Sequence, residues 1–267
     1  MRISRVYIEA DLATGRVLEL SPEAAAYVGR VLRLRSGDPL VLFNGHGGEF
    51  EAMVGAGSRG RFLVEVGAHR DLERESPLAI TLGLGVSRGE RMDYGLQKAV
   101  ELGVAEVVPL LTERCVVQLD RERAVTRLTH WRRVMASACE QCGRNRVPRL
   151  GEITGIADWL ETVAAVRRLV LSPVAATALA DLPPPEGPVV LLVGPEGGLA
   201  PVEVALAERA GFTPLRLGPR VLRTETAVVA ALAAIQGRWG DLGRGSGAGG
   251  PGGLPVLPPA DDGRDNP

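Results

Sequence analysis

The chain has 267 residues, of which 45% are hydrophobic and 24% charged, and its formal net charge at pH 7 is −1. This composition is typical of a globular protein with a buried core, and the overall charge does not indicate a nucleic-acid partner. No apolar run approaches the roughly 20 residues that a membrane-spanning helix needs. The N-terminus lacks the apolar region of a signal peptide, so we expect a cytoplasmic protein with no membrane partner.

Residues 1–72 predict a small β-barrel that contains one helix. Strands are expected over residues 6–8, 39–43, 49–54 and 61–66, where the side chains are β-branched or alternate in polarity. Residues 44–48, Asn-Gly-His-Gly-Gly, form a turn signal between two of these strands. Ser21 followed by Pro22 indicates a helix start, with serine as the N-cap.

Residues 73–240 show a different rhythm, in which short apolar strands alternate with helical patterns. The expected strands cover 78–86, 104–110, 168–172, 189–193 and 214–217, and the expected helices lie near 92–103, 124–142, 156–165, 201–210 and 225–239. Such alternation predicts a mostly parallel sheet with helices on both faces. Residues 241–267 are rich in glycine, proline and aspartate, cannot bury a core, and are predicted to be a disordered tail.

The cysteines and histidines predict neither disulfides nor a metal centre. Three cysteines are an odd and sparse set. Cys139 and Cys142 have the spacing of half a zinc site, but the three histidines provide no matching second half. We therefore expect small, mostly buried cysteine side chains and no bound metal.

A glycine-rich stretch, Gly194-Pro-Glu-Gly-Gly198, follows the strand expected over 189–193 and precedes a helix. Glycines there let a ligand approach the backbone, and free amides at the helix start can bind polar groups. An ordinary turn between a strand and a helix is the alternative. No Gly-Lys-Ser/Thr follows, and the third glycine of the Rossmann fingerprint is replaced by Arg88, so phosphate-centred nucleotide binding is not supported.

A second loop, Leu217-Gly-Pro-Arg-Val-Leu-Arg-Thr-Glu-Thr-Ala227, also precedes a helix. Thr224 is the expected N-cap, and Glu225 in the first turn suits the helix dipole. Capping does not explain Arg220 and Arg223, because the dipole disfavours cations just before a helix start. A site that holds an anionic partner would explain them.

Together the two loops closely resemble the ribosomal small subunit methyltransferase E family, within the SPOUT superfamily of knotted methyltransferases. Further segments match in the same order: residues 31–38 and 43–48 resemble its N-terminal PUA-like domain, and 97–104, 109–114 and 140–144 its central segments. The resemblance implies a SPOUT-type α/β fold with a knotted parallel sheet and helices on both faces. It also implies a PUA-like RNA-binding β-barrel at 1–72 and a methyltransferase domain at 73–240 with a C-terminal trefoil knot.

The resemblance further implies an enzyme that uses S-adenosylmethionine to methylate N3 of a uridine in 16S rRNA, free or within the small ribosomal subunit. It implies a homodimer with the active site at the subunit interface. Two other functions stay open: ribose 2′-O methylation of RNA, and a non-catalytic RNA-binding ribosome-assembly protein with a relic cofactor loop. The Arg-x-Glu-Thr-Ala signature and the intact loops argue against both.

The implied cofactor site comprises Leu171, Val193, Gly194, Pro195, Glu196, Gly197, Gly198, Leu217, Gly218, Val221, Leu222, Arg223 and Thr226. Arg223 is the candidate for stabilising the negative charge that develops on the base, and Glu225 or Glu196 for accepting the proton of N3. Glu196 has an alternative role, bonding the backbone of its own loop.

The implied RNA-binding residues are Arg30, Arg33, Arg35, Arg88, Lys98, Arg114, Gln141, Arg144 and Arg146. Arginine can bind phosphates in a bidentate manner and stack on splayed bases. The family usually has lysine at the position of Arg88. Solubilising or salt-bridged surface positions are the alternative for the N-terminal arginines and for Lys98.

Overall fold

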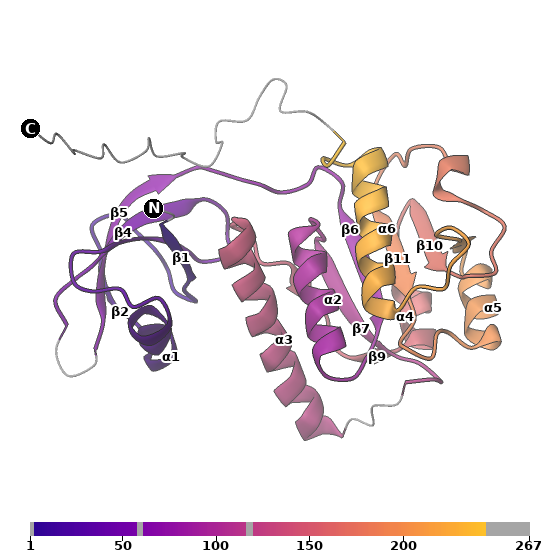
Figure 1. Ribbon diagram of the computed structural model, residues 1–267, viewed down its shortest axis with the longest axis horizontal. Helices are drawn as coiled ribbons and strands as arrows, with labels where there is room; N and C mark the ends of the chain where they lie inside the picture. Colours follow the sequence, from indigo (N-terminus) through magenta and orange to yellow (C-terminus); the bar gives the residue numbers. More distant parts are fainter. Residues whose placement is uncertain (1–2, 58–60, 116–119, 244–267) are drawn as a thin grey trace, which may run out of the picture. The chain divides into compact units, whose positions relative to one another are not determined.

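The computed structural model describes residues 3–57, 61–115 and 120–243. These residues form two compact units, the first from the described residues within 3–43 and 47–72 and the second from those within 44–46 and 73–243. Figure 1 gives the positions of the labelled helices and strands along the chain. Within the described residues, no helix has both the length and the hydropathy to cross a membrane.

The first unit is built on a five-stranded sheet. Its order is β1 (Ser4–Tyr7), β3 (Pro39–Phe43), β4 (Glu49–Val54), β5 (Leu63–Arg70) and β2 (Val17–Glu19). Strands β1 and β3 are parallel and the other pairs are antiparallel. The four predicted strands are confirmed as β1, β3, β4 and β5, with shifted ends for β1 and β5, and so is the turn between β3 and β4. The short strand β2 was not predicted, because three residues carry too little periodicity.

One helix packs against this sheet, as the sequence predicts. Helix α1 (Pro22–Ala26) begins after Ser21, whose side chain accepts a hydrogen bond from the Ala24 N–H at 3.2 Å. The helix continues as a π-helical turn over Tyr27–Val31. Val28 from this turn is fully buried with Leu42 and other apolar side chains of the sheet, which gives the unit its own hydrophobic core.

The second unit is built on a sheet in which every pair of strands is parallel. The order is β12 (Thr213–Leu215), β10 (Arg167–Leu171), β11 (Val189–Val193), β6 (Ile80–Gly85), β7 (Glu106–Leu111) and β8 (Arg149–Leu150), and β9 (Thr154–Gly155) also pairs with β7. All five residues of β11 are apolar and buried, as expected for a central parallel strand covered on both faces. The predicted parallel sheet is confirmed.

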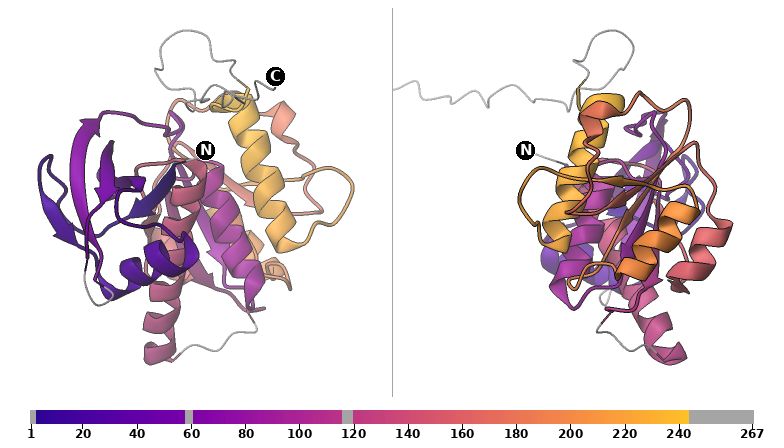
Figure 2. Two further views of the ribbon diagram at one scale, coloured as in Figure 1. Left: turned by 60° about the vertical axis from the view of Figure 1, so that its left-hand side comes forward. Right: turned by 90° about the vertical axis from the view of Figure 1, so that its right-hand side faces the viewer.

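Helices cover both faces of this sheet. Helix α2 (Glu90–Glu101) packs between α3 (Arg121–Cys142) and α6 (Thr224–Trp239), while α4 (Ile156–Thr162) and α5 (Pro201–Arg209) contact each other. Figure 1 and the right-hand view of Figure 2 show these two groups on opposite faces. A short 3-10 helix, Leu179–Asp181, lies between β10 and β11.

One detail of the second unit differs from the predictions. Arg223 is the N-cap of α6, with an extended backbone, and Thr224 is the first helical residue and is buried. The prediction of Thr224 as N-cap is therefore wrong by one position. The predicted tail over 241–267 lies outside the described residues from residue 244 onward.

Arg144 is a buried structural residue. Its side chain is 5% exposed, and its guanidinium donates to the carbonyl oxygens of Val100 and Val104, each at 2.9 Å. Its Nε and Nη2 bind the carboxylate of Glu75. Every nitrogen of the guanidinium thus has a partner inside the protein, and the prediction that Arg144 contacts RNA is corrected to a role in joining Glu75 to the end of α2.

We predict that Arg144→Ala destabilises the protein by about 3–5 kcal/mol, because it removes the guanidinium that pairs with the part-buried Glu75 carboxylate and donates to the Val104 carbonyl oxygen. Urea denaturation of the purified variant measures this. Arg149→Ala is the matched control: Arg149 also pairs with a glutamate, Glu106, but its side chain is 74% exposed, so a loss of at most about 1 kcal/mol is expected. Equal losses in the two variants would contradict the prediction.

Candidate active site

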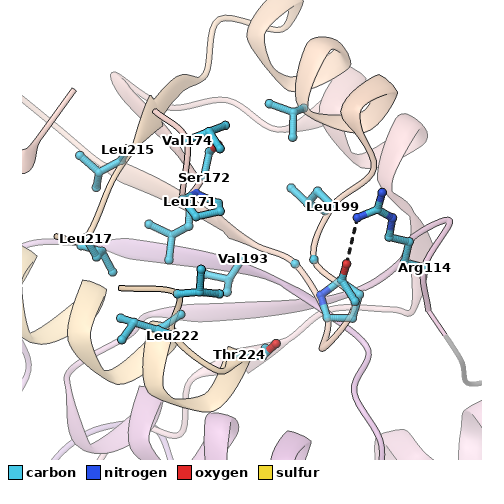
Figure 3. Close-up of a pocket in the computed structure, with 18 of the residues that line it drawn as sticks. Arg114, Leu171, Ser172, Val174, Val193, Leu199, Leu215, Leu217, Leu222 and Thr224 are labelled. Atoms are coloured by element: carbon cyan, nitrogen blue, oxygen red, sulfur yellow. Dashed lines mark hydrogen bonds between the residues drawn. The ribbon is translucent and has the colours of Figure 1, made fainter. Parts of the chain in front are cut away.

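A cavity of about 550 Å³ opens at the carboxyl ends of the neighbouring strands β12, β10 and β11. Three connections wall it: the segment after β10, the glycine-rich loop between β11 and α5, and the loop between β12 and α6. Figure 3 shows their side chains converging on one space. In open parallel sheets this end of the strands is the usual place for a ligand.

The loop after β11 is closely packed at Gly194, which has no room for a side chain. A Cβ on Gly194 would lie 2.8 Å from the backbone nitrogen of Leu199, and one on Gly85 of the neighbouring strand β6 would overlap Pro195. Gly198 adopts a left-handed φ of 68°, which glycine tolerates best. These constraints fix the path of the loop along one wall of the cavity.

The loop after β12 presents backbone to the cavity from another side. Gly218 has a φ of 71°, and apart from its chain neighbours no heavy atom of the described residues lies within 4 Å of the place its Cβ would occupy. Leu217, Val221 and Leu222 line the cavity around it. An open glycine in a ligand pocket allows close approach of a ligand to the main chain.

The walls are mostly apolar, with a few polar groups. Leu171, Val193, Leu199, Leu215 and Leu222 are among the apolar side chains that line the cavity. The polar lining side chains are Arg114, Ser172, Glu196, Glu208, Arg220 and Thr224. An apolar pocket of this volume with few polar groups is typical of a site for a small molecule or cofactor. Within the described residues, no three His, Cys, Asp or Glu side chains gather closely enough to hold a metal ion.

Most residues predicted for the cofactor site line this cavity. Those that do are Leu171, Val193, Gly194, Pro195, Glu196, Gly197, Gly198, Leu217, Gly218, Val221 and Leu222. Arg223 and Thr226 are not among its lining residues, whereas Thr224 and Ala227 are. The sequence analysis did not predict Ser172, Pro173, Val174 and Leu215 as cavity residues. They lie at or just after the carboxyl ends of predicted strands, and this position would have identified them.

Glu196 binds a backbone N–H, as in the alternative role considered for it, but one that lies before α2 and not in its own loop. Its Oε1 accepts from the Arg88 N–H at 2.9 Å and from Nη1 of Arg91 at 3.2 Å. Burial raises the pKa of Glu196, but the backbone N–H groups and the Arg91 guanidinium outweigh it, so the pKa lies below the ordinary value. A carboxylate held in its charged form joins the glycine loop to the start of α2 and is a weak acceptor of protons.

Glu225 and Arg223 lie at the start of α6, where their environments differ from that of Glu196. Oε2 of Glu225 is buried and has no hydrogen-bond partner among the described residues. Arg223 is exposed, and no capping bond of its side chain is formed. A buried carboxylate oxygen without a donor is costly, and such groups call for an explanation in terms of function.

The residues predicted to bind RNA fall into three groups. Those with exposed side chains are Arg30, Arg33, Arg35, Arg88, Arg114, Gln141 and Arg146. Lys98 is half-buried, with Nζ 2.8 Å from Oε1 of Glu101 and 5.6 Å from the ring centre of Tyr94. Arg144 is buried, as described above. Of the exposed group, only Arg114 lines the cavity, where Nη1 donates to the Gly197 carbonyl at 3.1 Å.

We predict that Glu196→Gln lowers the melting temperature at pH 7, and that the difference from the unchanged protein shrinks as the pH falls. The depressed pKa means that this carboxylate stabilises the fold above its unfolded pKa, and that the contribution is lost as the pH falls through the folded pKa. Thermal unfolding between pH 7 and pH 3 tests this. Glu161→Gln, an exposed change on α4, is the control, and a pH-independent difference for Glu196→Gln would refute the assignment.

Two family models match the chain. The model of an RNA methyltransferase domain matches residues 74–236, and the model of an RNA methyltransferase PUA domain matches residues 20–67.

Relatives match over most of the chain. It is 36% identical over 242 residues to the ribosomal RNA small subunit methyltransferase E of Buchnera aphidicola subsp. Schizaphis graminum, which covers 90% of this chain and 98% of that protein. It is 30% identical over 246 residues to the protein of the same name from Bacillus subtilis, covering 87% and 96%.

Solved structures agree. A putative methyltransferase from Legionella pneumophila with bound SAM is 41% identical, with a TM-score of 0.88, covering 91% of this chain and 100% of that one. The ribosomal RNA small subunit methyltransferase E of Neisseria gonorrhoeae, bound to S-adenosyl methionine, is 39% identical with a TM-score of 0.83, covering 90% and 100%. With this fold and this cavity, the chain belongs to the ribosomal RNA small subunit methyltransferase E family.

Proposed function

We propose that this protein binds S-adenosylmethionine in the cavity and methylates N3 of a uridine in 16S rRNA. The observation that carries the proposal is the convergence of the two glycine loops on one apolar cavity of about 550 Å³. Two similar proteins were solved with this cofactor bound. The alternatives, ribose 2′-O methylation and a non-catalytic assembly role, predict a different methylated atom or none.

The lining residues fit such a cofactor. Leu171, Leu217 and Leu222 offer apolar contact to a flat ring, and the open Gly218 leaves its main chain within reach of polar edges. When bound, S-adenosylmethionine supplies a methyl group that is already electrophilic, so the protein has only to orient the acceptor and remove its proton. No metal is needed for this chemistry.

Glu225 is our candidate for the proton acceptor. Its buried Oε2 has no donor among the described residues, so an N–H brought by the substrate would satisfy it. The carboxylate of Glu196 is engaged by Arg88 and Arg91 and its pKa is lowered. Of the two acids considered from the sequence, we therefore assign Glu225 to the proton and Glu196 to the loop.

Arg223 is our candidate for stabilising the negative charge on the carbonyl oxygens of the deprotonated base. It stands at the N-cap of α6, directly beside Glu225, and its side chain is exposed to an incoming substrate. A fixed guanidinium near developing charge is a common source of transition-state stabilisation. Its absence from the cavity lining agrees with contact to the acceptor base instead of the cofactor.

The exposed cations are our candidates for holding the rRNA. Residues 1–72 are assigned as the PUA-like RNA-binding domain, with Arg30, Arg33 and Arg35 as phosphate ligands, and 73–240 as the methyltransferase domain. Around the catalytic unit, Arg88, Arg114, Gln141 and Arg146 stay candidates. Because the substrate is ribosomal RNA, free or in the assembled subunit, we place the enzyme in the cytoplasm.

A homodimer and a C-terminal trefoil knot belong to the same proposal. Val174 and Val221 line the cavity yet are 89% and 82% exposed. A second copy of the chain packed against these two side chains would cover them. Exposed apolar side chains at the mouth of a site favour such an interface. Light scattering that gave the monomer mass would contradict the dimer, and an experimental chain trace without threading would contradict the knot.

We predict that 16S rRNA from a strain lacking this protein lacks one methyl group on N3 of a uridine, and that the gene restores it. Mass mapping of rRNA fragments locates the modified base, and the same assay run on ribose fragments identifies 2′-O methylation. Calorimetry with S-adenosylmethionine is the accompanying measurement, with saturable heat expected. An unchanged methylation pattern in the deletion strain would refute the proposed function.

We predict that Arg223→Ala and Glu225→Gln each lower kcat by about 10²–10³-fold, because charge stabilisation and proton transfer act on the transition state. Calorimetric affinity for S-adenosylmethionine should stay within about twofold, since neither residue lines the cavity. Arg220→Ala is the matched control: Arg220 precedes the same helix and does line the cavity, so it should weaken cofactor binding. A large loss of cofactor affinity in Arg223→Ala would contradict its role.

A further inference from the structure

Glu203 is a buried carboxylate that the proposed chemistry does not use. It is 4% exposed and lies in the first turn of α5, directly after the glycine loop. Its Oε2 accepts a hydrogen bond from the Ala200 N–H at 2.8 Å, which caps the helix. The positive end of the α5 dipole further favours a negative charge at this place.

The second oxygen of Glu203 reaches a distant part of the chain. Its Oε1 accepts from the backbone N–H of Glu113 at 2.7 Å, across 90 residues of sequence. Helix capping alone would not require this bond, and burying a carboxylate is costly unless its oxygens have donors. The bond therefore ties the start of α5 to the turn that follows β7.

That turn is held on two sides. The Cys115 N–H donates to the Thr112 carbonyl at 3.0 Å, which closes the turn, and Sγ of Cys115 lies 3.3 Å from the Val86 carbonyl oxygen. Glu203 holds the turn from the other side through Glu113. The residue between these two anchors is Arg114.

Arg114 reaches from the turn to the mouth of the cavity. Its Nη1 donates to the Gly197 carbonyl at 3.1 Å, and a Cβ on Gly197 would lie only 3.0 Å from the Cβ of Arg114. Its side chain is exposed and lines the cavity, as Figure 3 shows. A guanidinium there has donors left over for a substrate, because arginine carries five N–H groups.

The two faces of α5 thus have different roles. Pro201, Val204, Ala205 and Glu208, spaced as on one helix face, line the cavity. Glu203 lies on the opposite side of the first turn and binds the turn at 112–115. A change at Glu203 can therefore move Arg114 without removing any group from the cavity wall.

We propose that Glu203 is a positioning residue that holds Arg114 in place, and that Arg114 so placed contacts the RNA acceptor beside the cofactor. The proposal rests on the proposed function for the role of Arg114. The tie between Glu203 and the turn itself does not depend on that function, so the two parts can be tested separately.

The first test is amide hydrogen exchange of the full chain, without cofactor or RNA. In Glu203→Gln, exchange in the peptide that contains Glu113 should become faster, since an amide group replaces one of the accepting oxygens. Arg114→Ala should leave this exchange unchanged, because the Glu113 N–H does not bond to Arg114. Unchanged exchange in Glu203→Gln would overturn the tie, whatever the protein methylates.

The second test is a double-mutant cycle on methylation of small ribosomal subunits. Glu203→Gln and Arg114→Ala should each lower kcat/KM for RNA by about tenfold, and the double variant by about the same factor, because coupled residues are non-additive. Affinity for S-adenosylmethionine should stay within about twofold in Glu203→Gln, because Glu203 is not among the residues that line the cavity. A loss of about a hundredfold in the double variant would show that Glu203 acts independently of Arg114 and would overturn the proposal.

Asp181→Asn is the matched control. Asp181 makes the same kind of bond, accepting from the Ala178 N–H at 2.8 Å at the start of a helical turn, but it is exposed and does not line the cavity. It should change neither exchange at Glu113 nor kcat/KM. Should Glu203→Gln fail to fold, Glu203→Asp takes its place with the same expected outcomes, since the shorter side chain cannot reach both N–H groups. Absence of methylation by the unchanged protein would contradict the proposed function, but it would leave the tie between Glu203 and the turn standing.

Discussion

Parallel pairing of β10 with both β11 and β12 is the constraint on which the candidate site depends. The backbone bonds place the ends of these three strands side by side, although they lie at Leu171, Val193 and Leu215 in the sequence. Every loop that leaves the sheet there must start from the same edge. The position of the cavity is therefore a consequence of strand order, and the side chains determine its detailed shape.

Charged groups inside the second unit serve to hold these loops and helices together. Glu196 joins the glycine loop to α2, Glu203 joins α5 to the turn after β7, and Arg144 joins Glu75 to the end of α2. Each one satisfies backbone groups that are far away in the sequence. Because such groups are expensive to bury alone, their partners restrict the loops to one arrangement.

Local signals predicted the helices and the longer strands of the second unit, because an apolar run or a helical pattern is readable without its distant partners. The two-residue strands β8 and β9 are too short to carry such a pattern and were not predicted. The buried run Val189–Val193 and the glycines at 194, 197 and 198 were readable in this way. Features that depend on partners far away in the sequence could not be predicted. The burial of Arg144 depends on its pairing with Glu75, which is 69 residues away in the sequence. Ser172 lines the cavity only because β10 lies next to β11 in the sheet. The cap of α6 was misplaced because Thr224 has the right side chain but a helical backbone.

The unpaired Oε2 of Glu225 has a consequence for the stability of the whole protein. A carboxylate oxygen that is buried without a donor makes the folded state less stable than a neutral side chain of the same shape would. Selection for stability alone would remove it, and sequences drift toward such replacements when function is not required. Related chains that have lost the reaction are therefore expected to lose this acid first, while Gly194, which has no room for a side chain, persists for reasons of packing.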